Sequence, residues 1–243
     1  MALCLDCEGT HAEIARLFTM LELLKIRGNF FFTGQTARQF PSLVVEIAHA
    51  GHQIESHTDT HPNLRRLSPA DQRREILAGR QTIEDITGKA SLGFRAPMHL
   101  LNRSTVAILR EAGFRFDVSC LYFSYNMRPV VSFRPTWFRE WMPLYDALRL
   151  PPRAGYAPML AAASCARLPI LPVHPQYAGH LPRLIDGYRA MLETLMERGW
   201  KPQLFDAILA LPALELAGLT GHVWVAEQHA GKPATADALD RPG

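Results

Sequence analysis

Residues 28–62 of the chain read GNFFFTGQTARQFPSLVVEIAHAGHQIESHTDTHP, and this stretch predicts a strand, a helix and a second strand in succession. Three consecutive phenylalanines make residues 29–32 a short apolar run of the kind that forms a buried strand. Pro41 suits the first turn of a helix that we expect to close at Gly51. A further strand is predicted over His52–Ser56. Strands that alternate with helices in this way are typical of a parallel sheet.

The same alternation continues on both sides of this stretch. Short apolar runs predict strands at 2–5, 92–95, 114–119, 169–173 and 203–205, and helical periodicity predicts helices at 12–27, 68–87, 104–112, 181–198 and near the C-terminus. Residues 121–168 show no steady periodicity. We expect a parallel α/β fold, with one domain over 1–227 and a frayed tail over 228–243.

The composition is that of an ordinary globular protein, with 48% apolar and 20% charged residues among 243. The 26 basic and 23 acidic residues leave a net charge of +3, and no basic cluster predicts a nucleic-acid surface. The N-terminus shows no basic region followed by an apolar stretch. The two most apolar segments, 156–173 and 207–225, are interrupted by proline and charged residues, so we expect no membrane span. These features predict a cytoplasmic protein.

Four cysteines are too few for a disulfide scaffold in a chain of this length. Cys4 and Cys7 fit the bare spacing C-x-x-C, but the alternation of a strand places Cys4 with Asp6 on one face and Cys7 on the other. A redox pair is therefore disfavoured, and we expect reduced thiols.

Polar residues follow five of the predicted strands, at the end where parallel α/β folds carry their chemistry. These positions are 6–8, 57–61, 95–97, 117 and 174. The strongest cluster is SHTDTHP at 56–62, because His57 and His61 share one face if the segment turns helically. Two imidazoles with one carboxylate suit a divalent metal. The alternative is a polar loop in which both histidines only form hydrogen bonds.

Asp6 and Glu8 can supply the carboxylates that such a site needs. One of them can bind the metal while the other removes a proton from water that the metal has acidified. The alternative for Asp6 is that it caps the helix beginning near His11.

Five motifs in order carry a family resemblance: D-x-E at 6–8, H-T-x-x-H-P at 57–62, F-R-x-P at 94–97, G-F-x-x-D at 113–117 and P-V-H at 172–174. Together they resemble the polysaccharide deacetylases, carbohydrate esterase family 4. The resemblance extends over residues 3–205 and is weakest between 121 and 168. It implies a distorted, incomplete (β/α) barrel. It also implies an enzyme that removes acetyl groups with one divalent metal, zinc first, with cobalt or nickel as alternatives.

The resemblance assigns roles to four polar residues outside the metal ligands. Asp6 matches the general base, and Arg95 matches the arginine that pairs with it and keeps it ionised. His174 matches the general acid that protonates the leaving amine. Asp117 matches the carboxylate that orients this histidine and favours its charged form.

The resemblance makes His57 and His61 the two metal-binding histidines. At the third ligand the chain departs from the commonest pattern, which has two adjacent aspartates: Cys7 stands at the second position and Glu8 follows it. We expect Glu8 to be the ligand, as in the branches with an Asp-x-Glu arrangement. A Cys7 thiolate is the alternative.

Two further departures lie near the expected site. Pro172 stands where the family usually has leucine two residues before the histidine, and His180 is a nearby but less fitting alternative to His174. Met98 replaces an aromatic or other bulky residue. The aromatic side chains of residues 122–141 suit either stacking on a sugar or filling the mouth of the barrel.

The expected reaction is removal of an acetyl group from an N-acetylated sugar in a polysaccharide or glycan precursor. Two alternatives remain at this point. One is hydrolysis of another non-peptide C–N bond, in a cyclic ureide or formamide, and the other is a catalytically inactive glycan-binding relative. We expect neither a nucleic-acid partner nor an integral membrane span, and the sequence does not determine the oligomeric state.

Overall fold

The computed structural model describes residues 1–119, 131–132 and 151–212. In this part of the chain seven parallel strands form one sheet in the order β6-β5-β4-β3-β2-β1-β7. The strands are β1 (Ala2–Cys7), β2 (Asn29–Phe32), β3 (Gln53–Ser56), β4 (Gly93–Phe94), β5 (Phe116–Asp117), β6 (Val131–Ser132) and β7 (Ile170–Val173). The chain thus adds β2 to β6 on one side of β1 and returns with β7 on the other.

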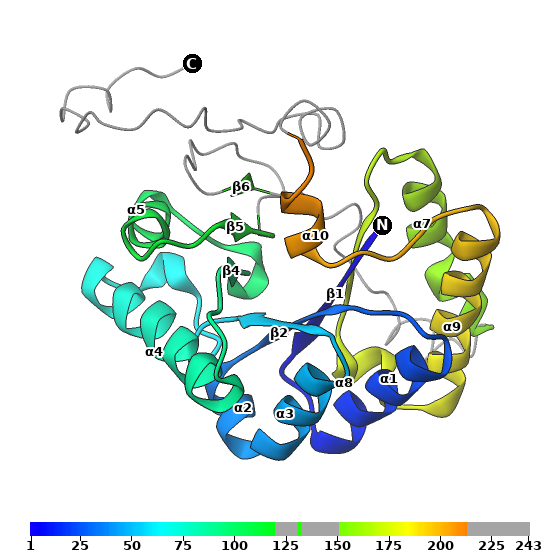
Figure 1. The fold of residues 1–243 in the computed structure, drawn as a ribbon, viewed down its shortest axis with the longest axis horizontal. Helices are drawn as coiled ribbons and strands as arrows, with labels where there is room; N and C mark the ends of the chain where they lie inside the picture. The colour runs from blue at the N-terminus through cyan, green and yellow to red at the C-terminus, as the bar shows by residue number, and fades with distance from the viewer. Residues whose placement is uncertain (120–130, 133–150, 213–243) are drawn as a thin grey trace.

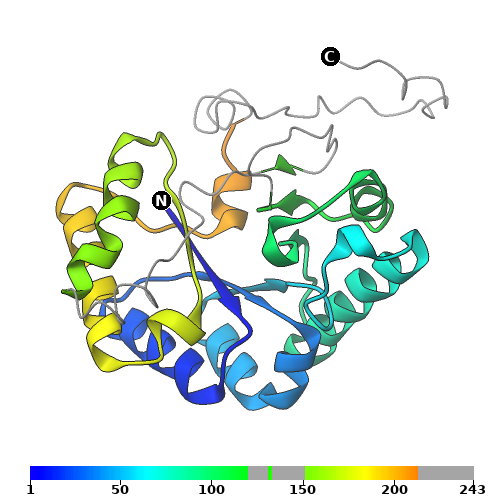
Figure 2. The same cartoon turned by 180° about the vertical axis from the view of Figure 1, so that it is seen from behind.

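Helices surround the outer side of this sheet as an arc (Figure 1), which is also visible from behind (Figure 2). They are α1 (His11–Leu23), α2 (Gly34–Gln39), α3 (Pro41–His49), α4 (Pro69–Thr87), α5 (Arg103–Glu111), α7 (Pro152–Cys165), α8 (Pro175–Ala178) and α9 (Pro182–Glu197). Two 3-10 turns, η1 (Leu64–Arg66) and η2 (Pro97–His99), and the short helix α10 (Phe205–Leu209) complete the described elements. This curled sheet with its helices confirms the expected incomplete (β/α) barrel.

Local signals in the sequence mark the start of α1 and both ends of α4, although α1 ends at Leu23, four residues before the predicted end. The Thr10 hydroxyl accepts from the Glu13 backbone N–H, and the Glu13 carboxylate accepts from the Thr10 backbone N–H, so α1 begins with a capping box. The Ser68 hydroxyl caps α4 by accepting from the Asp71 N–H, with Pro69 at the first helical position. Gly88 ends α4 in the left-handed conformation that glycine adopts without strain. None of the described helices is both long and apolar enough to span a membrane.

Alternation along β1 divides its side chains between two apolar layers. Leu3, Leu5 and Cys7 belong to the outer core, which packs against the surrounding helices. Ala2 and Cys4 face the inside of the curled sheet, in a cluster separate from that core. Cys7 thus packs outward and Cys4 inward, on the opposite faces that the alternation predicted.

The inside of the sheet is filled by α10, where the sequence predicted a strand over 203–205. That prediction was wrong. The Phe205 backbone N–H donates to the Asn29 side chain at 3.0 Å, and the Asp206 N–H donates to the Gln53 side chain at 3.2 Å. These strand residues satisfy N–H groups at the start of α10 that have no partner within a helix, so tertiary contacts favour a helix over a strand here.

Three other helices were missed by the sequence analysis, among them the four-residue α8 after β7. α2 lies between the predicted strand at 29–32 and the helix that begins at Pro41, and the Thr33 hydroxyl caps it by accepting from Thr36 N–H. α7 lies within the segment that showed no periodicity, and it contains Pro158. The predicted tail over 228–243 and the aromatic segment 122–141 lie outside the described residues, so the domain boundaries stay predictions.

Candidate active site

The strand register brings the first residues after several strands to one edge of the sheet. β1 pairs with β2 up to Cys7↔Phe32, and β2 pairs with β3 up to Phe32↔Ser56. Glu8 and His57 therefore leave their strands at the same level. Since parallel strands all end at one edge, the residues that follow β4 and β7 are delivered there too.

Glu8, His57 and His61 form a group whose ligand atoms all lie within 4.8 Å of one another. Glu8 Oε1 lies 3.5 Å from His57 Nε2 and 3.1 Å from His61 Nε2. The two imidazole rings are tilted against each other with centroids 4.9 Å apart. One carboxylate and two imidazoles that converge on a point form a ligand set that suits a divalent cation and leaves positions for water and substrate.

The hydrogen bonding of His57 tests whether a cation fits this group. His57 Nδ1 lies 2.7 Å from the Arg95 backbone oxygen, and a carbonyl can only accept, so this nitrogen carries the proton. In the neutral ring Nε2 then presents a lone pair. That atom is buried without a hydrogen-bond partner among the described residues. A buried acceptor that faces a carboxylate is compatible with a metal between them, and a backbone carbonyl that fixes the other ring nitrogen is the usual support for such a ligand.

The Glu8 carboxylate is held in the charged form that a metal ligand requires. Burial raises its pKa, but the adjoining His57 and His61 imidazoles outweigh burial and lower the pKa below its ordinary value. The residues present therefore fit a divalent cation.

The second predicted ligand candidate, Cys7, lies elsewhere. Its side chain is fully buried in the outer core, and its thiol contacts the Leu5 carbonyl oxygen at 3.5 Å. Burial, together with the nearby Asp6 and Glu8 carboxylates, raises the pKa of the Cys7 thiol well above its ordinary value. A thiolate ligand from Cys7 is therefore excluded in this arrangement.

Asp6 lies beside the Glu–His–His group and forms a buried ion pair with Arg95. Arg95 Nε is 2.6 Å from Asp6 Oδ1 and 2.7 Å from Oδ2, and neither side chain is more than 3% exposed. Burial raises the pKa of Asp6, but Arg95 first, and then His174 and His57, lower it below the ordinary value. Asp6 is thus a carboxylate that stays ionised inside the protein, as a general base requires.

His174 reaches the same carboxylate from the end of β7. Its Nε2 lies 3.3 Å from Asp6 Oδ2 and 4.0 Å from Glu8 Oε1. The ring is packed against Tyr177, with centroids 5.6 Å apart. His180, the alternative histidine, instead forms an exposed pair with Glu13 at 3.0 Å. Among the two, His174 is the one that the structure places in the site.

Asp117 is fully buried at the end of β5, where it organises the turn that follows Arg95. Its carboxylate accepts from the backbone N–H and the hydroxyl of Ser119. The Ser119 hydroxyl in turn accepts from the Ala96 N–H at 2.6 Å. The predicted pairing of Asp117 with His174 stays a prediction.

His99 belongs to this cluster, although the sequence analysis did not include it. Its Nε2 lies 3.1 Å from Arg95 Nη2. The one signal for His99 in the sequence was that it follows Arg95 by four residues. His52, at the start of the strand predicted over His52–Ser56, is buried, accepts from the Gly28 N–H and packs edge-on against Phe18 and Phe30.

The loop between His57 and His61 is held by α2 and α4. The Gly34 and Gln35 backbone N–H groups donate to the carbonyl oxygens of Thr58 and Asp59, both at 2.9 Å. The Glu75 carboxylate on α4 accepts from the N–H groups of Asp59 and Thr60 and from the Thr60 hydroxyl. The sequence analysis missed Glu75, because on a helical wheel it is one more charged residue of a solvated face.

The loop also contains strained backbone and a close approach. Thr58 and His61 have φ of +67° and +61°, values that non-glycine residues rarely adopt. A Cβ on Gly79 of α4 would lie 2.4 Å from the backbone carbon and oxygen of Thr58, so only glycine fits there. Packing against α4 thus holds the spacing of His57 and His61.

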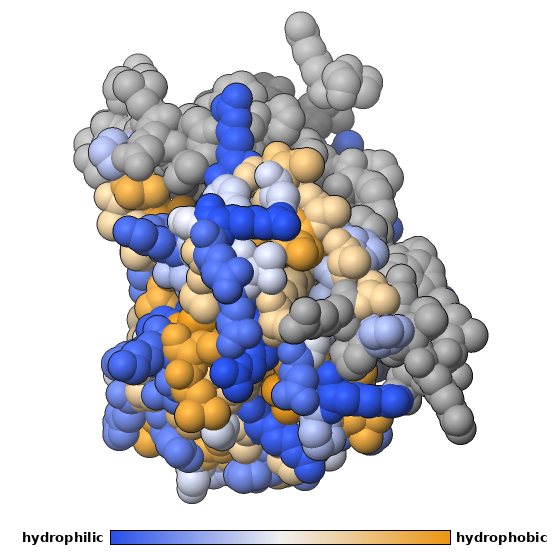
Figure 3. Space-filling model, turned by 90° about the vertical axis from the view of Figure 1, so that its right-hand side faces the viewer, coloured by the Kyte–Doolittle hydropathy of each residue, from blue (hydrophilic) through white to orange (hydrophobic). Residues whose placement is uncertain are grey.

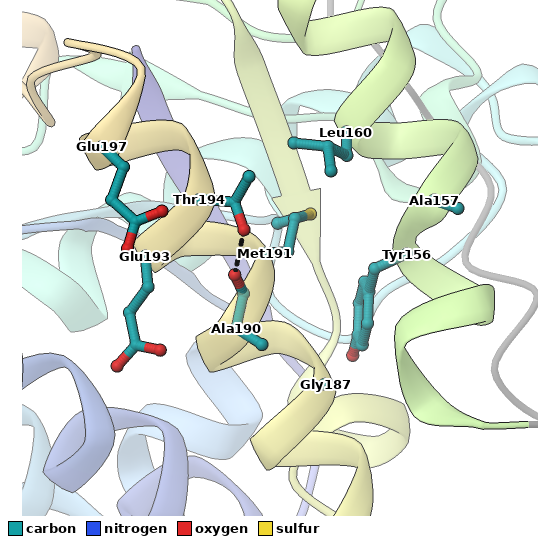
Figure 4. Close-up of a pocket in the computed structure, with 9 residues that line it drawn as sticks. All are labelled: Tyr156, Ala157, Leu160, Gly187, Ala190, Met191, Glu193, Thr194 and Glu197. Carbon is teal, nitrogen blue, oxygen red and sulfur yellow. Dashed lines mark hydrogen bonds between the residues drawn. The ribbon is translucent and has the colours of Figure 1, made fainter.

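A separate cavity of about 290 Å³ lies between α7 and α9 (Figure 4). Its lining comes from these two helices: Tyr156, Ala157, Leu160, Gly187, Ala190, Met191, Glu193, Thr194 and Glu197. The side of the molecule at the right of Figure 1 shows hydrophilic residues interspersed with apolar ones (Figure 3). None of the residues predicted for the site lines this cavity.

Comparison with known proteins connects this geometry to a family. Residues 1–116 match the family model for polysaccharide deacetylase. The chain is 31% identical over 98 residues to peptidoglycan-N-acetylglucosamine deacetylase of Bacillus cereus, a match that covers 40% of this chain and 35% of the relative. It is 29% identical over 90 residues to chitooligosaccharide deacetylase of Bradyrhizobium, covering 37% of this chain and 41% of that protein. The chain thus spans about a third of the length of the first of these relatives.

Solved structures show the fold over a longer part of the chain. A Mycobacterium smegmatis protein described as a polysaccharide deacetylase superposes with a TM-score of 0.74 at 21% identity, covering 93% of this chain and 82% of the other. A family 4 carbohydrate esterase from Streptomyces lividans gives a TM-score of 0.62 at 22% identity, covering 84% and 91%. A Bacillus anthracis pseudoenzyme of the same family also gives 0.62, at 18% identity, covering 83% and 62%. At these identities the likeness establishes the fold alone.

Proposed function

We propose that this chain, whose residues 1–116 match the polysaccharide deacetylase family, is a metal-dependent hydrolase that removes the acetyl group from an N-acetylated sugar. The observation that carries the proposal is the convergence of the Glu8–His57–His61 group with the buried Asp6–Arg95 pair. The names of the curated relatives support N-acetylglucosamine in a peptidoglycan or chitin-like oligomer as the substrate class.

The Glu8–His57–His61 group would hold the cation, and zinc suits two imidazoles with one carboxylate. Such a cation supplies Lewis acidity, which polarises a carbonyl group and acidifies water. A cytoplasmic location stays part of the proposal and would be tested by cell fractionation.

The remaining residues of the site divide the proton transfers between them. Asp6, kept ionised by Arg95, would take the proton from the attacking water. His174 Nε2, 3.3 Å from the same carboxylate, would donate a proton to the sugar nitrogen as the C–N bond breaks. The burial of Asp6 and Arg95 keeps competing water away from this pair.

The test combines metal content, measured by mass spectrometry, with acetate release from N-acetylglucosamine oligomers. We expect about one divalent ion per chain in the wild type, loss of the ion in His57→Ala, and a retained ion without acetate release in Asp6→Asn. His49→Ala, a histidine exposed on the surface, is the matched control and should behave as the wild type.

Each alternative predicts a different result. An inactive glycan-binding relative would hold the ion and bind the oligomer without releasing acetate. A hydrolase of another C–N bond would lose activity on a ureide or formamide in Asp6→Asn while never releasing acetate. A wild type that takes up no ion when zinc or cobalt is added would overturn the proposal.

A further inference from the structure

We propose that His99 is a positioning residue of this site, which holds Arg95 in place so that Arg95 can orient the Asp6 carboxylate. The inference rests on the proposed function, because it assigns a task within the same reaction. It starts from the contact between His99 Nε2 and Arg95 Nη2 at 3.1 Å.

The contact fixes the protonation of the imidazole. A guanidinium only donates hydrogen bonds, so His99 Nε2 accepts and the ring proton lies on Nδ1. Burial and then the Arg95 charge support this neutral state by lowering the pKa of His99 to about 3. His99 thus acts as a neutral acceptor and places no second positive charge beside Arg95.

Arg95 needs this acceptor because its side chain is fully buried. Its Nε donates to Asp6, its Nη1 donates to the Val118 carbonyl oxygen at 3.0 Å, and its Nη2 donates to His99. Each of the three nitrogens has one partner on a different segment. Removing His99 as an acceptor leaves a buried charged donor unsatisfied, and the guanidinium is then free to turn away from Asp6.

The backbone around His99 is strained in the way that a functional constraint predicts. Met98 and His99 have φ of +55° and +57°, in the left-handed region that non-glycine residues rarely adopt. The strained turn directly follows Arg95 and Pro97 and folds the imidazole back onto the guanidinium.

Two variants with similar bulk at the same backbone position separate the acceptor from the packing. His99→Gln offers an amide oxygen at the reach of Nε2, whereas His99→Leu offers no acceptor. We expect His99→Leu to lower kcat for acetate release at least tenfold with KM changed less than threefold. His99→Gln should recover at least a third of the wild-type kcat.

The metal content and the urea unfolding of both variants complete the test. Both should hold the ion as the wild type does, because His99 is not one of the three ligands. Equal kcat in the leucine and glutamine variants would overturn the inference, and so would a leucine variant that stays within twofold of the wild type. A wild type that releases no acetate would instead overturn the proposed function, so the two failures are distinguishable.

Discussion

Replacing Gly79 with alanine tests whether α4 holds the loop that carries His57 and His61. An alanine in the middle of a helix ordinarily stabilises a protein by about 1 kcal/mol relative to glycine. Here the new Cβ would lie 2.4 Å from the Thr58 backbone carbon and oxygen, where an ordinary contact begins at 3.4 Å. The loop and the helix must therefore separate by about 1 Å.

This separation should change both the stability of the protein and its affinity for zinc. Overpacking typically costs about 1–3 kcal/mol, which reverses the gain in helix propensity, and we expect a net loss of about 1 kcal/mol in the free energy of unfolding. Metal sites tolerate changes of only about 0.2 Å in ligand distances. A shift of about 1 Å at Thr58, next to His57, should therefore weaken zinc binding at least tenfold.

Gly88→Ala is the matched control, because it is the same change on the same helix. Gly88 has φ of +66° with no atom within 4 Å of a built Cβ, so alanine there costs about 1 kcal/mol through the backbone alone. Urea unfolding of the metal-free protein would measure stability, and calorimetric titration with Zn²⁺ would measure affinity. The reasoning is refuted if Gly79→Ala binds zinc within twofold of the wild type, or if Gly88→Ala weakens binding equally.

Three further predictions concern α4 and the inside of the sheet. Glu75→Gln should weaken zinc binding about tenfold, as loss of outer support does at other metal sites, and unchanged affinity in the same titration would contradict this role. Ser68→Ala should lower the free energy of unfolding by about 1 kcal/mol through loss of the N-cap, with no change in metal affinity; no loss in urea unfolding would show that the cap contributes nothing. Burial raises the pKa of Glu55 from 4.5 to about 7, so the folded state holds this proton more tightly than the unfolded state does. The stability that this proton contributes is fully present below pH 4.5 and is lost as the pH rises through 7. The expected loss in the free energy of unfolding between pH 4.5 and pH 8 is about 3 kcal/mol. Glu55→Gln should not show this loss when its unfolding is measured at the same two pH values. An equal pH dependence in the wild type and in Glu55→Gln would contradict the prediction.

Elements with strong local signals could be predicted closely from the sequence. The α4 helix was expected over 68–87 and lies at Pro69–Thr87, because Ser68, Pro69 and Gly88 mark its ends independently of the rest of the fold. β2 and β3 were also predicted close to their observed positions. The apolar runs that predicted longer strands at 92–95 and 114–119 contain only the two-residue strands β4 and β5.

Elements that depend on distant partners were predicted poorly. Phe205 begins a helix instead of ending a strand, because Asn29 and Gln53 supply acceptors from two other strands. Those contacts join residues separated by 176 and 153 positions, and no local pattern encodes them.

The sequence by itself determined which side chains are available and which face of a strand each one takes. Alternation along β1 placed Cys4 on the opposite face from Cys7, and the spacing of His57 and His61 indicated a shared site. The family resemblance implied that Arg95 pairs with Asp6, 89 positions away. Only the tertiary structure decided that His99 completes the contacts of Arg95, and that Cys7 lies away from Glu8, His57 and His61. The physical reason is that local backbone geometry sets the strand face that each side chain takes and the spacing of neighbouring residues. The contacts between distant residues follow instead from the order and curl of the parallel strands.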